Sequence, residues 1–209
     1  MSRGFPTQGP APAGMSMVLP NAETKEFKGE QELLTPEEWT LLETTQATEE
    51  DKASLPQPLV VDPPKAMTPQ ERDAHGHYML KMNIAQKIML AKVGNQEARN
   101  VLIHDPNRVI PLAVIRNPRI TEDEIIMYAQ LRTIPEEVFW AISKHKTWVK
   151  NYQVKLALVS NPKAPLSLAI KLLDYLHDRD LKIVSRSKNV SYVLARSAAR
   201  LLYKRMGQE

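Results

Sequence analysis

Apolar residues along positions 76–209 recur every three or four residues, in runs of roughly 8–14 residues. The first run includes Tyr78, Met79 and Met82, and the last ends at Leu201 and Leu202. No run shows the strict apolar–polar alternation that is typical of a half-buried strand. The pattern predicts an all-α domain of short helices over residues 67–209.

Two of these apolar runs are interrupted by an Asn-Pro dipeptide, within "LAVIRNPRITEDEII" and "LALVSNPKAPLSLAIKLL". We expect Asn117 and Asn161 each to end a helix in the left-handed backbone conformation, which Asn tolerates. The proline that follows cannot continue the helix. Thr121 is suited to cap the next helix, and Pro165 is suited to its first turn.

The same corner chemistry recurs in "RTIPEEVFWA" and in "SKNVSYVLA", where Ser191 is the expected cap. A helix, a tight corner and a second helix, repeated every 20–47 residues or so, indicate a solenoid of short antiparallel helix pairs. The spacing is irregular over residues 130–155, so the repeat register there stays open.

The segments "LAVIRNPRITEDEI", "LALVSNPKAPLSLAIKLL" and "IVSRSKNVSYVLARSAARLL" resemble the leucine-rich repeat variant family. That family is a bacterial helical repeat related in shape to the HEAT and armadillo repeats. The resemblance covers residues 88–205 and implies a right-handed α-solenoid. An iron–sulfur cluster sometimes accompanies the family, but this chain has no cysteine to bind one, and we expect no cofactor.

Residues 1–66 have a different composition from the rest of the chain. Ten of the sixteen prolines lie by position 69, and residues 1–75 hold 6 Lys and Arg against 13 Asp and Glu, whereas residues 76–209 hold 22 against 11. Few apolar residues are present to offset the entropy of ordering. We therefore expect an acidic, mostly disordered segment, with residues 1–30 fully disordered.

One island within this segment, residues 35–46, has the signals of a short helix. Thr35 can cap it, Pro36 fits its first position, and Glu38 can complete a capping box. Trp39, Leu41 and Leu42 then form an apolar face, which suggests a docking motif for a partner or for the chain's own domain. The alternatives are a transient helix without function and an acidic cover over the basic domain.

Few residues suggest catalysis or metal binding. His75 and His77 could bind a metal only with a third ligand from elsewhere. Glu122, Asp123 and Glu124 follow the expected cap Thr121, so they are better explained as the acidic first turn of a helix than as a general acid and base. The sequence has no glycine-rich phosphate loop, and we expect neither an enzyme nor a metal site.

Basic residues gather in three groups, the first of them interleaved with Trp148 and Tyr152. Recurring at repeat spacing, they could line one side of a solenoid. We expect a non-catalytic scaffold or adaptor with a basic concave surface for an acidic or peptide partner protein. The alternative is a nucleic-acid-binding module that uses the same face. The simplest explanation is a solvent-exposed basic face that only keeps the protein soluble. The candidate partner-binding residues are Lys144, Lys146, Trp148, Lys150, Tyr152, Lys155, Lys182, Arg186, Lys188, Arg196, Arg200 and Lys204.

No apolar stretch approaches the ~18 residues that a membrane span requires, and the first twenty residues lack the apolar core of a signal peptide. Together with the lack of cysteine, this favours a cytoplasmic location. The oligomeric state stays open.

Overall fold

The computed structural model describes residues 34–45, 53, 55–61 and 68–207. Within these ranges the regular structure is helical, without a strand, as the spacing predicted. The helices are α1 (Pro36–Thr44), α3 (Gln57–Val60), α4 (Pro69–Lys81), α5 (Ile84–Val93), α6 (Gln96–Leu102), α7 (Val109–Ile115), α8 (Glu122–Gln130), α9 (Glu136–Lys144), α10 (Tyr152–Ser160), α11 (Leu166–Leu173), α12 (Asp178–Arg186) and α13 (Tyr192–Arg205), with a 3₁₀ turn, η2 (Trp148–Lys150).

Helix starts follow the local signals in the sequence. Thr35, Thr68 and Thr121 each cap a helix, and each forms a reciprocal capping box with the glutamate three residues later. Ser191 accepts a hydrogen bond from the Leu194 amide and caps α13, which confirms that prediction too. These starts are fixed locally, because both partners lie within one helical turn.

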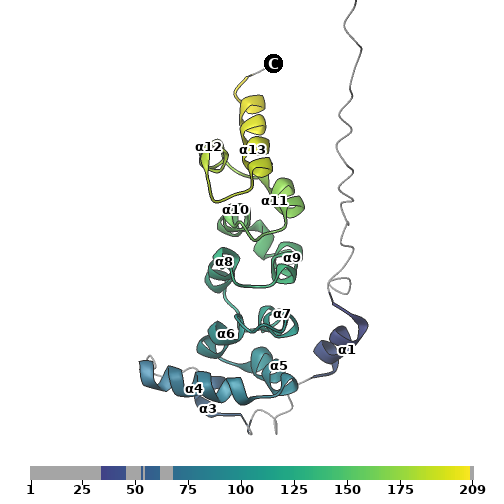
Figure 1. Cartoon of the computed structure of the whole chain (residues 1–209), viewed down its shortest axis with the longest axis vertical. Helices are drawn as coiled ribbons and strands as arrows, with labels where there is room; N and C mark the ends of the chain where they lie inside the picture. Colours follow the sequence, from purple (N-terminus) through teal and green to yellow (C-terminus); the bar gives the residue numbers. More distant parts are fainter. Residues whose placement is uncertain (1–33, 46–52, 54, 62–67, 208–209) are drawn as a thin grey trace, which may run out of the picture.

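From α5 onward the helices lie in two rows (Figure 1). The first row holds α5, α7, α9, α11 and α13, and the second holds α6, α8, α10 and α12. Contacts run along the rows, as between α5 and α7 or α8 and α10, and across them, as between α12 and α13. Within residues 130–155, where the spacing is irregular, the 3₁₀ turn η2 packs against both α9 and α10.

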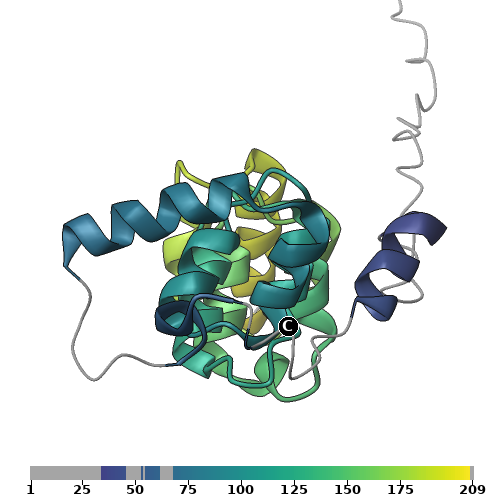
Figure 2. The same cartoon turned by 90° about the horizontal axis from the view of Figure 1, so that it is seen from below.

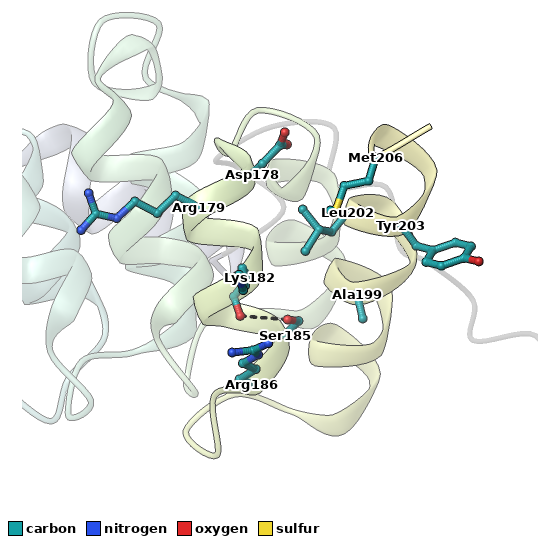
Figure 3. A pocket seen from close by; sticks show the side chains of 9 residues that line it. All are labelled: Asp178, Arg179, Lys182, Ser185, Arg186, Ala199, Leu202, Tyr203 and Met206. Atoms are coloured by element: carbon teal, nitrogen blue, oxygen red, sulfur yellow. Dashed lines mark hydrogen bonds between the residues drawn. The ribbon is translucent and has the colours of Figure 1, made fainter. Parts of the chain in front are cut away.

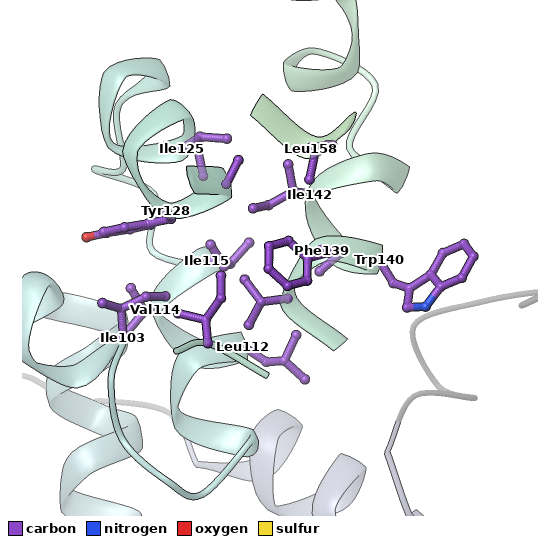
Figure 4. Close-up of a cluster of buried hydrophobic side chains, with 14 of the residues drawn as sticks. Ile103, Leu112, Val114, Ile115, Ile125, Tyr128, Phe139, Trp140, Ile142 and Leu158 are labelled. Carbon is purple, nitrogen blue, oxygen red and sulfur yellow. The ribbon is translucent and has the colours of Figure 1, made fainter. Parts of the chain in front are cut away.

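The hydrophobic core lies between the two rows (Figure 4). Tyr128 from α8, Phe139 and Ile142 from α9 and Leu158 from α10 are fully buried there. Helix α7 is buried along its whole length, because α5, α9 and α1 all pack on it.

The two Asn-Pro corners form, but not by the mechanism expected from the sequence. Asn161 is extended, with φ −84° and ψ 122°, and no non-glycine residue in the described part of the chain has a positive φ. Instead its buried amide donates to the carbonyls of Ala129 (2.8 Å) and Leu131 (2.6 Å), where α8 ends. The side chain therefore joins this corner to the end of α8, 30 and 32 residues earlier.

Two more buried asparagines do the same. Asn117 donates to the carbonyls of Ala91 (2.8 Å) and Gly94 (3.1 Å), and Asn95 donates to Pro58 (2.8 Å) and Val61 (2.9 Å). Each amide satisfies carbonyls that a helix end or a loop leaves without a partner. The three asparagines are therefore tie points along the stack.

A buried ion pair joins α6 and α8, two helices of the second row. Arg99 of α6 and Glu124 of α8 are 3% and 2% exposed, and two N–O contacts of 2.8 Å join them. Burial raises the pKa of Glu124, but the hydrogen bond from Arg99 and the Thr121 cap outweigh it, and the net shift is downward.

Part of the chain before residue 67 packs with the helical domain. Leu34, Leu42, Leu55 and Leu59 are buried in the same core as the later helices. Helix α1 lies against α7 on the outer side of the first row (Figure 2). The expected disorder of residues 1–30 concerns a stretch outside the described residues.

Within the ranges that the structure describes, no helix combines the length and the apolar character needed to cross a membrane.

Candidate protein-interaction site

A cavity with a largely apolar lining lies between α12 and α13, at the far end of the stack from α1 (Figures 1 and 3). It is a groove of about 560 Å³. Its lining residues are Asp178, Arg179, Lys182, Ser185 and Arg186 from α12, and Ala199, Leu202, Tyr203 and Met206 from α13 and the residue after it.

The α13 side of the groove is apolar, because Ala199, Leu202, Tyr203 and Met206 line it. Leu194 and Ala198 face inward and are buried, whereas Tyr203 and Met206 are each 73% exposed. Within the described ranges no helix follows α13, so no described helix covers these side chains. An apolar helix face of this kind is typical of an interaction site.

The α12 side of the groove is basic. Residues 179, 182 and 186 recur at helical spacing, so Arg179, Lys182 and Arg186 share one side of the helix. In Figure 3, Lys182 and Arg186 lie along the groove, and the Arg179 guanidinium extends away from α13. Asp178 is paired with Arg205 at 3.0 Å, so the rim keeps an excess of positive charge.

The first predicted basic group is largely occupied by internal contacts. Trp148 is buried and stacks on His145 at 3.7 Å between ring centroids. Tyr152 hydrogen-bonds Asp180 and stacks on His177 at 4.4 Å, and burial together with the Asp180 bond raises the pKa of Tyr152. Tyr152 therefore joins the start of α10 to the start of α12, whereas the Trp148 stack lies within residues 145–148.

The lysines around these aromatic residues are spread over several elements. Lys144 ends α9 half-buried, and Lys146 and Lys150 are exposed on either side of Trp148. Lys155 bonds the Lys150 carbonyl at 3.3 Å and lies over the Tyr175 ring at 5.4 Å. None of them lines the α12–α13 groove.

The second and third groups lie on the last two helices. Lys182 and Arg186 line the groove, while Lys188 lies exposed in the corner that follows α12. Arg196, Arg200 and Lys204 are exposed on α13 but do not line the groove. The structure thus brings two of the twelve predicted residues together with an apolar surface.

The sequence reasoning missed the other groove residues. Arg179 could have been found from its spacing to Lys182 and Arg186. Leu202 and Met206 could not, because their periodicity is that of an ordinary buried face. Only the tertiary structure shows that no described helix covers that face.

The predicted docking motif is seated on the chain itself. Leu42 is 1% exposed, and Trp39 and Leu41 are half-buried against the core. Arg116 lies over the Trp39 ring at 4.7 Å. Of the two docking modes left open, the structure shows the intramolecular one.

In the described part of the chain, no cluster of three or more His, Cys, Asp or Glu is positioned to hold a metal ion. Glu122, Asp123 and Glu124 form the first turn of α8, as expected. Comparison of the chain with family models, curated proteins and solved structures finds no match. The resemblance to the leucine-rich repeat variants therefore stays a prediction.

Proposed function

We propose that this protein is a non-catalytic scaffold or adaptor, built as an α-solenoid of the HEAT or armadillo kind. In this proposal it binds an acidic amphipathic helix of another protein in the groove between α12 and α13. The two rows of short helices support the solenoid part of the proposal.

One observation carries the binding part: the groove joins an apolar wall and a basic wall. Leu202 and Met206 offer apolar surface, and Lys182 and Arg186 face it from the neighbouring helix. An amphipathic helix with leucines at i, i+3 or i+4 and i+7, and glutamates beside them, complements both walls. Such a helix would lie in the position that a next repeat would take.

The test uses the full chain and defined probes. A fluorescent acidic amphipathic peptide is titrated with the protein, and a lysine-for-glutamate version of the peptide is the charge control. Lys182→Glu combined with Arg186→Glu is expected to weaken binding by about tenfold or more, since close opposite charges become like charges. Lys188→Glu is the matched control, because Lys188 is exposed and basic but lies outside the groove.

The nucleic-acid alternative is tested in the same assay with a labelled DNA duplex. Duplex binding should fall with salt by a slope of about −0.9 per phosphate contacted. A peptide held mainly by apolar contact should respond far less to salt. Tight duplex binding with no peptide binding would replace the scaffold proposal by the nucleic-acid one.

A further inference from the structure

Helix α1 lies on the outer side of the first row (Figure 2). The surface under α1, which we call the seat, is formed by Lys92, Arg108, Leu112, Ile115 and Arg116, and its centre is apolar. Leu42 fills this centre against Leu112 and Ile115 of α7 and Ala141 of α9. The remaining space there is only about 10 Å³, so the fit is close. Five of the nine residues of α1 nevertheless stay exposed, so a small set of contacts holds the helix.

Two arginines of the seat bind acidic side chains of α1. Arg108 donates to both carboxylate oxygens of Glu38, at 2.9 and 2.6 Å. Arg116 donates to Glu43 at 2.6 Å and lies over the Trp39 ring. The bond from Arg108 holds the pKa of Glu38 down at about 2. Bidentate arginine contacts of this kind give direction as well as energy.

A lysine binds the other end of the helix. Lys92 of α5 donates to the carbonyls of Leu42 and Thr45, the latter at 2.8 Å. These carbonyls lie at the C-terminal end of α1, where backbone acceptors lack helical partners and the macrodipole is negative. The seat therefore recognises three general features: an acidic first turn, an apolar middle and a helix C-terminus.

None of these three features requires that the bound helix belong to the same chain. A nine-residue helix is marginal in water by itself. Its occupancy of the seat is favoured by the covalent connection, which supplies a high effective concentration. A helix of the same character on another protein would make the same contacts.

We infer that the surface of Lys92, Arg108, Leu112, Ile115 and Arg116 is a second binding site, for an acidic amphipathic helix of a partner protein. Helix α1 is its intramolecular occupant, and the partner helix displaces it. The site lies far along the stack from the α12–α13 groove (Figure 1), and it does not rest on the function proposed for that groove.

The experiment uses a fluorescent peptide of residues 34–45, "LTPEEWTLLETT", and the full-length chain. The unmodified chain keeps α1 in the seat and should bind the peptide weakly. Trp39→Ala combined with Leu42→Ala removes the apolar contacts of α1 and should raise the peptide affinity at least about tenfold by freeing the seat. Glu37→Ala is the control, because Glu37 is exposed on the same helix and α1 should stay seated.

A charge exchange identifies the site. The chain with Trp39→Ala and Leu42→Ala is called the emptied chain, because α1 no longer fills the seat. In this chain, Arg108→Glu should abolish binding of the peptide, and a peptide that carries Glu38→Arg should restore it. Chains that also carry Lys182→Glu and Arg186→Glu should bind the peptide equally well, which separates this site from the groove. Should the double alanine variant unfold by circular dichroism, a chain with Glu38→Arg keeps the apolar contacts of α1 and releases it by repulsion from Arg108.

Two results would overturn the inference. One is a peptide affinity that is equal in the unmodified and the emptied chains. The other is binding that survives Arg108→Glu, or that the exchanged peptide fails to restore.

Discussion

Replacing Glu124 by Gln tests whether the buried ion pair with Arg99 stabilises the stack. Gln has nearly the same shape and can keep the capping box with Thr121. It removes the negative charge and leaves the Arg99 guanidinium buried, with the Gly94 carbonyl at 2.9 Å as its remaining strong acceptor. The substitution therefore isolates the charge from the cap and from packing.

The expected loss is large because both partners are nearly inaccessible to water. Removing one partner of a buried pair typically costs ~3–5 kcal/mol, and we expect ~3 kcal/mol because Gln keeps part of the hydrogen bonding. For a domain of this size, that corresponds to a decrease in Tm of about 6–12 °C. Adding Arg99→Met removes the uncompensated charge and should recover at least ~1 kcal/mol.

The assay is urea unfolding of the full chain followed by circular dichroism. Asp123→Asn is the matched control, because Asp123 lies in the same first turn of α8 but is exposed. A loss in the free energy of unfolding below ~1 kcal/mol for Glu124→Gln, or no larger than that of Asp123→Asn, would refute a stabilising role of the ion pair. A chain with both Glu124→Gln and Arg99→Met that is less stable than Glu124→Gln alone would refute it as well.

Three further predictions concern the tie points, the glycines and the seat of α1. Asn161→Ala should lower the free energy of unfolding by ~2–4 kcal/mol in urea, because two buried carbonyls lose their donor. Asn189 is exposed, so Asn189→Ala should change it by less than ~0.5 kcal/mol. Equal effects of the two substitutions would contradict the role of Asn161 as a tie point. Gly94→Ala should lower the Tm, because the added Cβ would lie 2.5 Å from the Leu90 carbonyl oxygen. Gly76 lies inside α4, and a Cβ added there would have nothing within 4 Å. Gly76→Ala should therefore stabilise the protein by ~0.5–1 kcal/mol. The reverse order of the two glycine variants would refute the packing argument. Arg108 lowers the pKa of Glu38 from 4.5 to about 2, so the contribution of Glu38 to the docking of α1 is complete above pH 4.5 and is lost as the pH falls toward 2. Hydrogen exchange of the α1 amides, corrected for the intrinsic pH dependence of exchange, should show the release of α1 over this range in the unmodified chain. The Glu38→Gln chain should show no such pH-dependent release.

Helix starts were predictable from the sequence, because a cap and its partner lie within one turn. The Thr-x-x-Glu boxes at Thr35, Thr68 and Thr121 needed no knowledge of the fold. Helix ends at the Asn-Pro corners were predictable in position but not in mechanism. The acceptors of the Asn161 amide lie 32 and 30 residues earlier, beyond the reach of any local rule.

The candidate site was less predictable than the fold. Trp148 and Tyr152 have the side chains of a binding surface, but Trp148 is buried and Tyr152 is in contact with His177 and Asp180. Periodicity places a residue on one face of a helix without saying what covers that face. Ile183 and Val193 continue the apolar pattern and are still 59% and 51% exposed, because no described helix packs over them.

The sequence by itself determined that this chain forms short capped helices, and that its charge divides between an acidic start and a basic remainder. Both properties depend on neighbouring residues or on composition alone. Only the tertiary structure decided that Arg99 meets Glu124, that three asparagines join successive corners, and that α1 lies on α7. Those contacts join residues 23 or more positions apart in the sequence, and the packing of the two rows brings them together. In the same arrangement no described helix lies over the outer side of α12 and α13, and the groove between them is open there.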